Sequence, residues 1–295
     1  MSSLRGLAYE RWSGAGNTFF VVEAGELPAA WRPAALARHV CAGGRGRSVD
    51  GLIVLDGTRA ALWNPDGSKP AFCGNGARCV AARLMQRRRL ERVRLRFGRV
   101  PLEAWREGRE IALRVPRPCR LRLRHPARLA AALGEAAPRL IDAAWIRAGV
   151  PHLCLLFASR EGRGGLGPGQ RSRLRSLGAR LRGDPAFGPQ GTNVTFLWKG
   201  ASDRAAVTMR TFERGVEDLT GACGSGALAA GQLLLGRRKT GIARLRVTSG
   251  ATLSVRRSGS EWDLCGPARR IGRGSLRLPR SGSLRHAART RRAGG

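Results

Sequence analysis

The chain has 295 residues, enough for two domains of about 150 residues each. Its seven cysteines are odd in number and scattered without a Cys-x-x-Cys pair, which argues against a disulfide framework and against a zinc ribbon. The formal net charge is +34, and only three of the 54 basic residues are lysines. Because the arginines are spread along the chain without interleaved aromatic residues, we expect salt-sensitive attraction to polyanions but no specific nucleic-acid site.

The sequence also lacks the signals of a membrane or exported protein. It contains no run of about eighteen apolar residues, and residues 1–5 do not form the apolar core of a secretion signal. We therefore expect a cytoplasmic protein that does not enter a membrane. The four histidines and the scattered cysteines show no metal-ligand spacing, so we expect no metal site.

The first half, residues 1–117, is predicted to consist of strands around one helix. A hairpin is expected over Leu7–Val22 with its turn at Gly14–Asn17, and a short helix over Ala34–Val40. A central helix is expected to begin near Asn75 and end among Arg87–Arg89, where cations suit a helix C-terminus. Further strands are expected at Leu52–Leu55, Ala60–Trp63, Val93–Phe97 and Ile111–Val115.

The second half, residues 118–265, follows a crossover at Pro116–Pro118. A loop is expected at Val150–His152, a glycine- and arginine-rich insertion at Arg160–Gly169, and a second central helix after Cys223. The chain from about Gly274 onward is basic and poor in apolar residues, so disorder is expected there, and residues 277–295 are expected to form a basic tail outside the two halves. Strands are expected at Ala143–Ala148, Leu153–Phe157, Thr192–Trp198 and Ala205–Phe212.

A short segment occurs twice, 150 positions apart. Cys73-Gly74-Asn75-Gly76-Ala77 and Cys223-Gly224-Ser225-Gly226-Ala227 each place a thiol on a glycine-rich turn directly before a run of small and apolar residues. A cysteine at a helix N-terminus faces unpaired backbone N–H groups and the positive end of the helix dipole, and both favour the thiolate. We therefore expect two reactive thiols, one per half, that act as a paired acid and base. The other five cysteines are expected to be small buried core residues: Cys41, Cys79, Cys119, Cys154 and Cys265.

Polar loops accompany this repeat in a fixed order. They are Gly16-Asn17, Asn64-Pro65-Asp66-Gly67, Pro151-His152, Gly191-Thr192-Asn193 and Glu213-Arg214-Gly215. Together with the two cysteine turns, and most strongly in Phe72–Cys79 and Glu213–Gly226, they resemble the diaminopimelate epimerase family from about Trp12 to Ala268. That family interconverts LL- and meso-diaminopimelate without a cofactor, in lysine and peptidoglycan biosynthesis.

The resemblance implies an α+β fold of two pseudo-symmetric halves, with the active site in the cleft between them. Each half would be a curved, barrel-like mixed sheet around a central helix, and a strand near 266–276 would return to the first half. The resemblance also implies a homodimer and a small amino-acid substrate, with no cofactor, no metal and no membrane or specific nucleic-acid partner.

The resemblance implies a role for each matching residue. Cys73 and Cys223 would be the catalytic acid and base, and His152 and Glu213 would tune their ionisation. The N–H groups of Gly74, Asn75, Gly224 and Ser225 would hold the reacting carboxylate, as a helix N-terminus does for an anion. Asn17, Asn64 and Asn193 would also contact the substrate, with Glu213 on an amino group and Arg214 on the distal carboxylate.

Three departures from the family pattern keep other functions open. Val150 stands where the family usually has Asn, Ser48 where it usually has Gly, and Leu219-Thr220-Gly221 where a Glu-Thr pair is common. A related epimerase or racemase of a different amino acid therefore remains an alternative, as does a basic nucleic-acid-binding protein on an inactive epimerase scaffold. A pyridoxal enzyme would need a Schiff-base lysine, and only Lys69 lies near these motifs.

Overall fold

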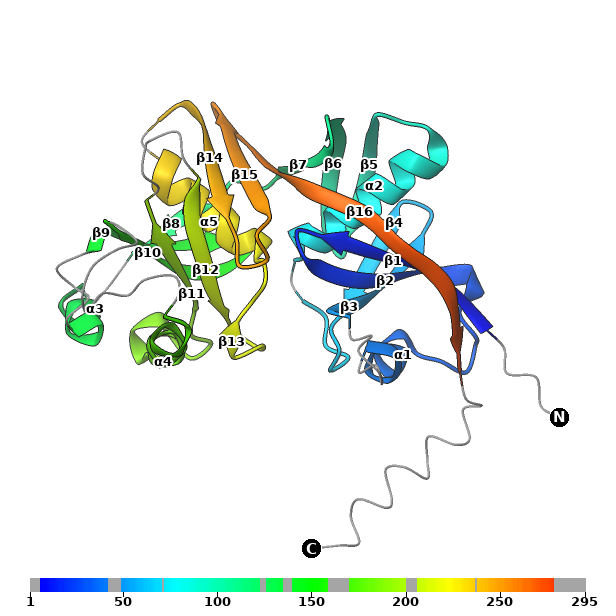
Figure 1. The fold of residues 1–295 in the computed structure, drawn as a ribbon, viewed down its shortest axis with the longest axis horizontal. Helices are drawn as coiled ribbons and strands as arrows, with labels where there is room; N and C mark the ends of the chain where they lie inside the picture. The colour runs from blue at the N-terminus through cyan, green and yellow to red at the C-terminus, as the bar shows by residue number, and fades with distance from the viewer. Residues whose placement is uncertain are drawn as a thin grey trace, which may run out of the picture.

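One continuous sheet passes through both halves of the molecule (Figure 1). The computed structural model describes residues 6–41, 49–70, 72–122, 126–134, 140–158, 170–199, 206–236 and 238–278. The expected insertion at Arg160–Gly169 lies entirely outside these ranges. The two halves stand side by side in Figure 1, each with one helix enclosed by its strands.

The first half contains seven strands, an enclosed helix and an outer helix in the described residues. The enclosed helix α2 (Gly74–Arg88) ends among the arginines that were predicted to terminate it. The outer helix α1 (Pro33–Cys41) follows the short 3-10 turn η1 (Ala24–Glu26). The strands are β1 (Gly6–Gly14), β2 (Asn17–Glu23), β3 (Gly51–Asp56), β4 (Arg59–Trp63), β5 (Arg92–Phe97), β6 (Val100–Glu107) and β7 (Glu110–Val115).

The second half is built in the same way. Helix α5 (Gly224–Leu235) is enclosed, and α4 (Arg171–Arg182) lies outside with the shorter α3 (Pro126–Leu133) and the 3-10 turn η3 (Pro185–Phe187). The strands are β8 (Cys119–Leu121), β9 (Leu140–Ala148), β10 (Val150–Phe157), β11 (Asn193–Trp198), β12 (Val207–Glu213), β13 (Asp218–Leu219), β14 (Thr240–Arg246), β15 (Thr252–Ser258) and β16 (Glu261–Arg277).

The order of strand directions repeats between the halves. From β1 to β7 the neighbouring pairs are antiparallel, parallel, antiparallel, parallel, antiparallel and antiparallel. The path β9-β10-β11-β12-β14-β15-β16 has the same order. The outer helices α1 and α4 and the enclosed helices α2 and α5 occupy matching places in the two paths. The expected α+β fold of two pseudo-symmetric halves is therefore confirmed.

Strand β16 joins the halves. Its first residues pair with β15 and with β7, and residues Ala268–Arg277 then pair with β1, which closes the first half into a barrel. In Figure 1 this strand crosses from one half to the other. The returning strand predicted near 266–276 is thus present. Disorder from Gly274 was a wrong prediction, because Gly274 to Arg277 pair with Tyr9 to Gly6. Residues 279–295 lie outside the described residues.

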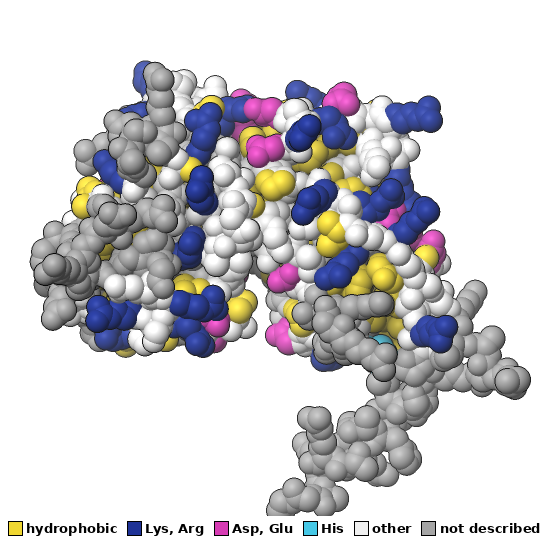
Figure 2. Space-filling view, viewed as in Figure 1, with side chains coloured by type: hydrophobic (Ala, Val, Ile, Leu, Met, Phe, Trp, Pro, Cys, Tyr) yellow, Lys and Arg dark blue, Asp and Glu magenta, His cyan; other side chains and the backbone are white. Residues whose placement is uncertain are grey.

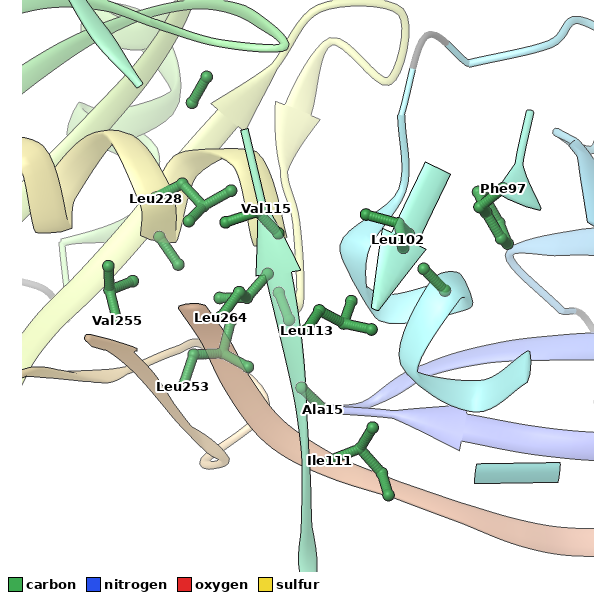
Figure 3. Packing of buried hydrophobic residues seen from close by; sticks show 14 of the residues in the cluster. Ala15, Phe97, Leu102, Ile111, Leu113, Val115, Leu228, Leu253, Val255 and Leu264 are labelled. Carbon is green, nitrogen blue, oxygen red and sulfur yellow. The ribbon is translucent and has the colours of Figure 1, made fainter. Parts of the chain in front are cut away.

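The hydrophobic core is continuous across the junction. One cluster of buried side chains includes Leu102 and Phe97 from the first half and Leu228 and Val255 from the second, with Leu264 of β16 between them (Figure 3). Separate clusters lie under α1 in the first half and under α4 in the second. In each half, therefore, one helix covers each face of the sheet. The two halves share a core around β7 and β16.

Several sequence-based predictions need correction. Val150 to His152 form the start of β10 and not a loop, because His152 pairs in register with Asn193 of the parallel strand β11. Cys119 is exposed on β8, whereas Cys41, Cys79, Cys154 and Cys265 are buried as expected. The elements α3, α4, β6, β8, β13, β14 and β15 were not predicted.

Figure 2 shows the basic side chains dispersed over both halves of the face drawn there. In the same view the surface is hollowed between the lower parts of the two halves. Of the helices that the structure describes, none has the length and apolar character needed to cross a membrane.

Candidate active site

The two repeated cysteines occupy the same position on the two enclosed helices. Cys73 is the N-cap of α2 and Cys223 the N-cap of α5, both with extended backbone angles. The Cys73 Sγ accepts a hydrogen bond from the Gly76 N–H at 3.3 Å, and the Cys223 Sγ accepts one from Gly226 at 3.3 Å. Each thiol therefore satisfies one of the backbone donors that a helix leaves free at its start.

The N-termini of the two helices meet at a pair of glycines. A Cβ placed on Gly224 would lie 3.4 Å from the Gly74 Cα, and one placed on Gly74 would lie 2.7 Å from Leu264 Cδ2. A side chain on Gly74 would therefore collide with Leu264, and one on Gly224 would fill the remaining space between the two helix starts. The repeated sequence therefore places the two thiols at facing helix ends, where the halves of the molecule meet.

A polar bridge links the halves beside these glycines. Asn75 Nδ2 donates to Asn17 Oδ1 at 2.5 Å and to the Ala222 carbonyl at 3.3 Å, which belongs to the other half. The Asn17 amide also donates to Asp50 at 3.2 Å. Asn17 and Asn75, which we expected to contact substrate, therefore also fix the position of the segment that carries Cys223.

His152 reaches Cys223 through Ser225. The Ser225 Oγ lies 3.4 Å from the Cys223 Sγ and 2.9 Å from His152 Nε2, and His152 Nδ1 lies 3.1 Å from the Thr195 hydroxyl. His152 is 0% exposed, and this burial lowers its pKa to about 3. The imidazole is therefore neutral near pH 7, and it orients Ser225 without adding a positive charge.

Three further residues lie next to this cluster: Asn193, Glu213 and Arg214. Asn193 Nδ2 donates to the Pro151 carbonyl at 3.1 Å, and Asn193 Oδ1 accepts from the Arg214 N–H at 2.8 Å. The Glu213 carboxyl accepts from the Thr220 hydroxyl at 2.7 Å and also hydrogen-bonds Cys223. The Arg214 guanidinium donates to the Gln190 carbonyl at 3.2 Å. Residues from β10, β11, β12 and α5 thus converge on Cys223.

Burial outweighs the helix N-termini in setting the ionisation of the two thiols. Burial raises the pKa of Cys73 to about 11, although the Gly76 N–H lowers it. Burial and the neighbouring Glu213 raise the pKa of Cys223 well above its usual range. The expected effect of the helix N-terminus, which favours the thiolate, is therefore opposed at both cysteines by the larger effect of burial.

One carboxyl group acts on both cysteines. Glu213 raises the pKa of Cys73 and of Cys223, while burial and the charge of Asp50 raise its own pKa. These groups therefore lie close enough to interact across the junction. An ammonium group placed among them would offset the mutual repulsion of their anionic forms.

Asn64 differs from the other predicted side chains in its hydrogen bonds. Its side chain donates to Ser68 Oγ at 3.0 Å within its own turn, and within the described ranges no hydrogen bond links it to either cysteine.

Two cavities of about 570 and 540 Å³ lie away from the cysteines, one beside α2 and β16 and one along α4.

Sequence reasoning missed four polar residues of this region: Asp50, Arg78, Thr195 and Thr220. Arg78 carried a readable signal, since it is a charged residue inside a run of small and apolar residues on a helix predicted to be buried. The two threonines gave no such signal, because hydroxyl side chains are common and the tertiary fold alone decides what each of them hydrogen-bonds.

The chain is similar in sequence to proteins named diaminopimelate epimerase. It is 32% identical to that of Chlorobaculum tepidum over 280 residues, which cover 90% of this chain and 100% of the relative. It is 34% identical to that of Desulforudis audaxviator over 239 residues, which cover 76% of this chain and 81% of the relative. A scan against protein-family models found no match.

Solved structures share the fold at low sequence identity. A phenazine biosynthesis PhzF-family protein of Enterococcus faecalis aligns with a TM-score of 0.65 and 17% identity, covering 93% of this chain and 100% of its own. A hydroxyproline epimerase of Agrobacterium vitis, solved with bound trans-4-OH-L-proline, aligns with a TM-score of 0.59 and 15% identity, covering 96% of each chain. At these identities the similarity shows the fold alone.

Proposed function

The chain belongs to the diaminopimelate epimerase family, and we propose that it interconverts LL- and meso-diaminopimelate by moving an α-proton between two cysteines. That it is an isomerase of the epimerase type follows from its relatives. The observation that carries the proposal is the pair of thiols, Cys73 and Cys223, at facing N-termini of two enclosed helices.

Epimerisation needs a base on one face of the α-carbon and an acid on the other. A thiolate at one of the two positions would remove the proton, and the thiol at the other would deliver a proton to the opposite face. The raised pKa values suit this task, because a thiolate of higher pKa is a stronger base toward a very weak carbon acid.

The helix ends would stabilise the charge that develops during the reaction. Proton removal spreads negative charge onto the carboxylate of the substrate, and the backbone N–H groups of Gly74, Asn75, Gly224 and Ser225 lie at the two helix starts. Fixed donors of this kind, in a site that excludes water, lower the energy of such an intermediate.

The neighbouring side chains would bind and orient the substrate. The ammonium group would lie against Glu213, where it would lower the pKa of the adjacent thiols and so favour formation of the thiolate. Arg214 would pair with the distal carboxylate, with Asn193 fixing the loop that carries it. Asn17 and Asn64 remain proposed substrate contacts.

A second candidate is an epimerase or racemase for a different amino acid. It is favoured by Val150, which replaces a substrate-contacting amide of the family by an apolar side chain at the start of β10. The neighbouring Gly149 lies against Phe72, since a Cβ there would be 3.7 Å from Phe72 Cβ. This end of the site would then accept a less polar substrate.

Incubation with LL-diaminopimelate in deuterated water tests the proposal. The wild-type protein is expected to incorporate deuterium at the α-carbon and to form the meso isomer, whereas Cys73→Ala and Cys223→Ala are each expected to form no meso isomer. Absence of α-deuterium at high protein concentration would refute the diaminopimelate activity. Turnover of a different amino acid under the same conditions would support the second candidate. A homodimer and a cytoplasmic location remain predictions.

A further inference from the structure

The turn over residues 213–217, which carries Arg214 and is called the Arg214 turn below, contains a glutamate with an unfavourable backbone. Glu217 has a φ of 55°, in the left-handed region that residues other than glycine rarely adopt. The Glu213 carbonyl accepts a hydrogen bond from the Glu217 N–H at 2.8 Å, which closes the turn. Because a second glycine beside Gly215 would fit this backbone without strain, the side chain of Glu217 contributes something that glycine cannot.

The side chain of Glu217 folds back onto its own turn. Its Oε1 accepts a hydrogen bond from the Gly215 N–H at 3.0 Å. The residue before this glycine, Arg214, donates its own N–H to Asn193 Oδ1 at 2.8 Å. Two side-chain oxygens therefore hold two consecutive N–H groups at the base of the Arg214 side chain. The direction in which Arg214 leaves the turn depends on both of these acceptors.

The same carboxylate oxygen connects the turn to helix α4. Glu217 Oε1 also accepts from Arg182 Nε at 2.9 Å, and Arg182 is the last residue of α4. The Arg182 carbonyl in turn accepts from the Thr192 N–H at 3.0 Å. Two residues before Thr192, the Gln190 carbonyl accepts from the Arg214 guanidinium at 3.2 Å. Arg182 is therefore bonded both to the turn at the base of the Arg214 side chain and to the loop at its tip.

The charges in this group are divided unequally between the two arginines. The Glu217 carboxylate pairs with Arg182, and both side chains are partly exposed, 53% and 26%. Arg214 is held by the neutral oxygens of Gln190, and among the residues that the structure describes no carboxylate lies within ion-pair distance of it. The positive charge of Arg214 therefore remains available to an anionic ligand. Since an ion pair this exposed adds little to stability, its main effect is on the position of the turn.

We propose that Glu217 and Arg182 are positioning residues for Arg214, which fix its turn and so set the preference for an amino acid with a second carboxylate. This inference rests on the proposed function, in which Arg214 pairs with the distal carboxylate of the substrate. That carboxylate is remote from the α-carbon, so loss of the pair weakens substrate binding and leaves proton transfer almost unchanged.

Steady-state kinetics with LL-diaminopimelate provide the first test. Glu217→Gly suits the backbone but removes the carboxylate, so KM is expected to rise about tenfold while kcat stays within about twofold of the wild type. Glu217→Gln keeps an oxygen that can accept from the Gly215 N–H, and its KM is expected to rise only about threefold. Arg182→Met, which removes the other member of the ion pair, is also expected to raise KM about threefold. An unchanged KM in Glu217→Gly, or a large fall in kcat at unchanged KM, would overturn the inference.

Arg175→Met is the matched control. Arg175 Nε, on the same helix, pairs with Asp218 Oδ1 at 2.9 Å, the same distance as in the Arg182–Glu217 pair. Asp218 Oδ1, however, accepts from the Leu219 N–H, which lies beyond the Arg214 turn. The control is therefore expected to keep the wild-type KM. A rise in KM equal to that of Arg182→Met would contradict a specific role of the Arg182–Glu217 pair.

Amide hydrogen exchange of the full-length protein without substrate provides a second test that does not depend on activity. The Gly215 N–H is expected to exchange about tenfold faster in Glu217→Gly than in the wild type, because its acceptor is gone, and at the wild-type rate in Arg175→Met. Equal exchange in the wild type and in Glu217→Gly would overturn the inference, whatever the kinetics show. If the wild type does not convert LL-diaminopimelate, the proposed function fails, and the exchange rates still decide whether Glu217 holds the turn.

Discussion

His152 is predicted to make the stability of the protein depend strongly on pH. Its pKa is lowered from 6.5 to about 3 by complete burial, so the folded state holds it neutral while the unfolded state protonates it below pH 6.5. Its contribution is therefore fully present above pH 6.5 and is lost as the pH falls toward 3. Each pH unit in this window is worth about 1.4 kcal/mol, so about 2 kcal/mol is lost between pH 6.5 and pH 5.

Urea unfolding of the wild type and of His152→Gln at pH 7.5, 6 and 5 measures this loss. The variant keeps a hydrogen-bonding side chain beside Ser225 and Thr195 but cannot take up a proton, so its stability is expected to fall about 2 kcal/mol less than that of the wild type. At pH 7.5 the variant is expected to be about 1–3 kcal/mol less stable, from poorer packing and hydrogen bonds. The other three histidines are common to both proteins and cancel in the comparison. Equal losses of stability between pH 7.5 and pH 5 would refute the reasoning.

Two further predictions concern the junction and the carboxyl group beside it. Gly74→Ala is expected to destabilise the protein by about 1–3 kcal/mol and to slow epimerisation, because the new Cβ would lie 2.7 Å from Leu264 Cδ2; thermal unfolding and turnover measure this. Gly25→Ala, where a Cβ has no neighbour within 4 Å, is the control, and equal effects of the two substitutions would contradict the packing argument. Glu213→Gln is expected to lower the pKa of Cys223, since a neighbouring negative charge is removed; an unchanged pH midpoint of Cys223 alkylation would show that Glu213 does not act on it.

The sequence predicted best what depends on local chemistry. The hairpin with its turn at Gly14–Asn17 and the two helices after the cysteines follow from glycine-rich turns and from runs of small apolar residues. Helix α4 could also have been predicted, because Leu174, Leu177 and Leu181 lie on one face and are buried in the structure.

Features set by long-range pairing could not be predicted in this way. Residues Gly274–Arg277 are polar and basic, and they become a strand only because β1 offers them a partner. Val150–His152 form a strand start through pairing with β9 and β11. The pKa values of Cys73 and Cys223 depend on how deeply the packed halves bury the thiols, which the local sequence around each cysteine does not contain.

The central claim is that two thiols act on opposite faces of one α-carbon, and isotope partitioning at low conversion tests it most directly. LL-diaminopimelate is incubated with the wild-type protein in deuterated water, and the early product and the recovered substrate are analysed separately. A proton removed by one cysteine and a deuteron delivered by the other predict α-deuterium in the meso product and almost none in the recovered substrate. Comparable deuterium in both would indicate a single base that serves both faces, and would contradict the two-thiol account.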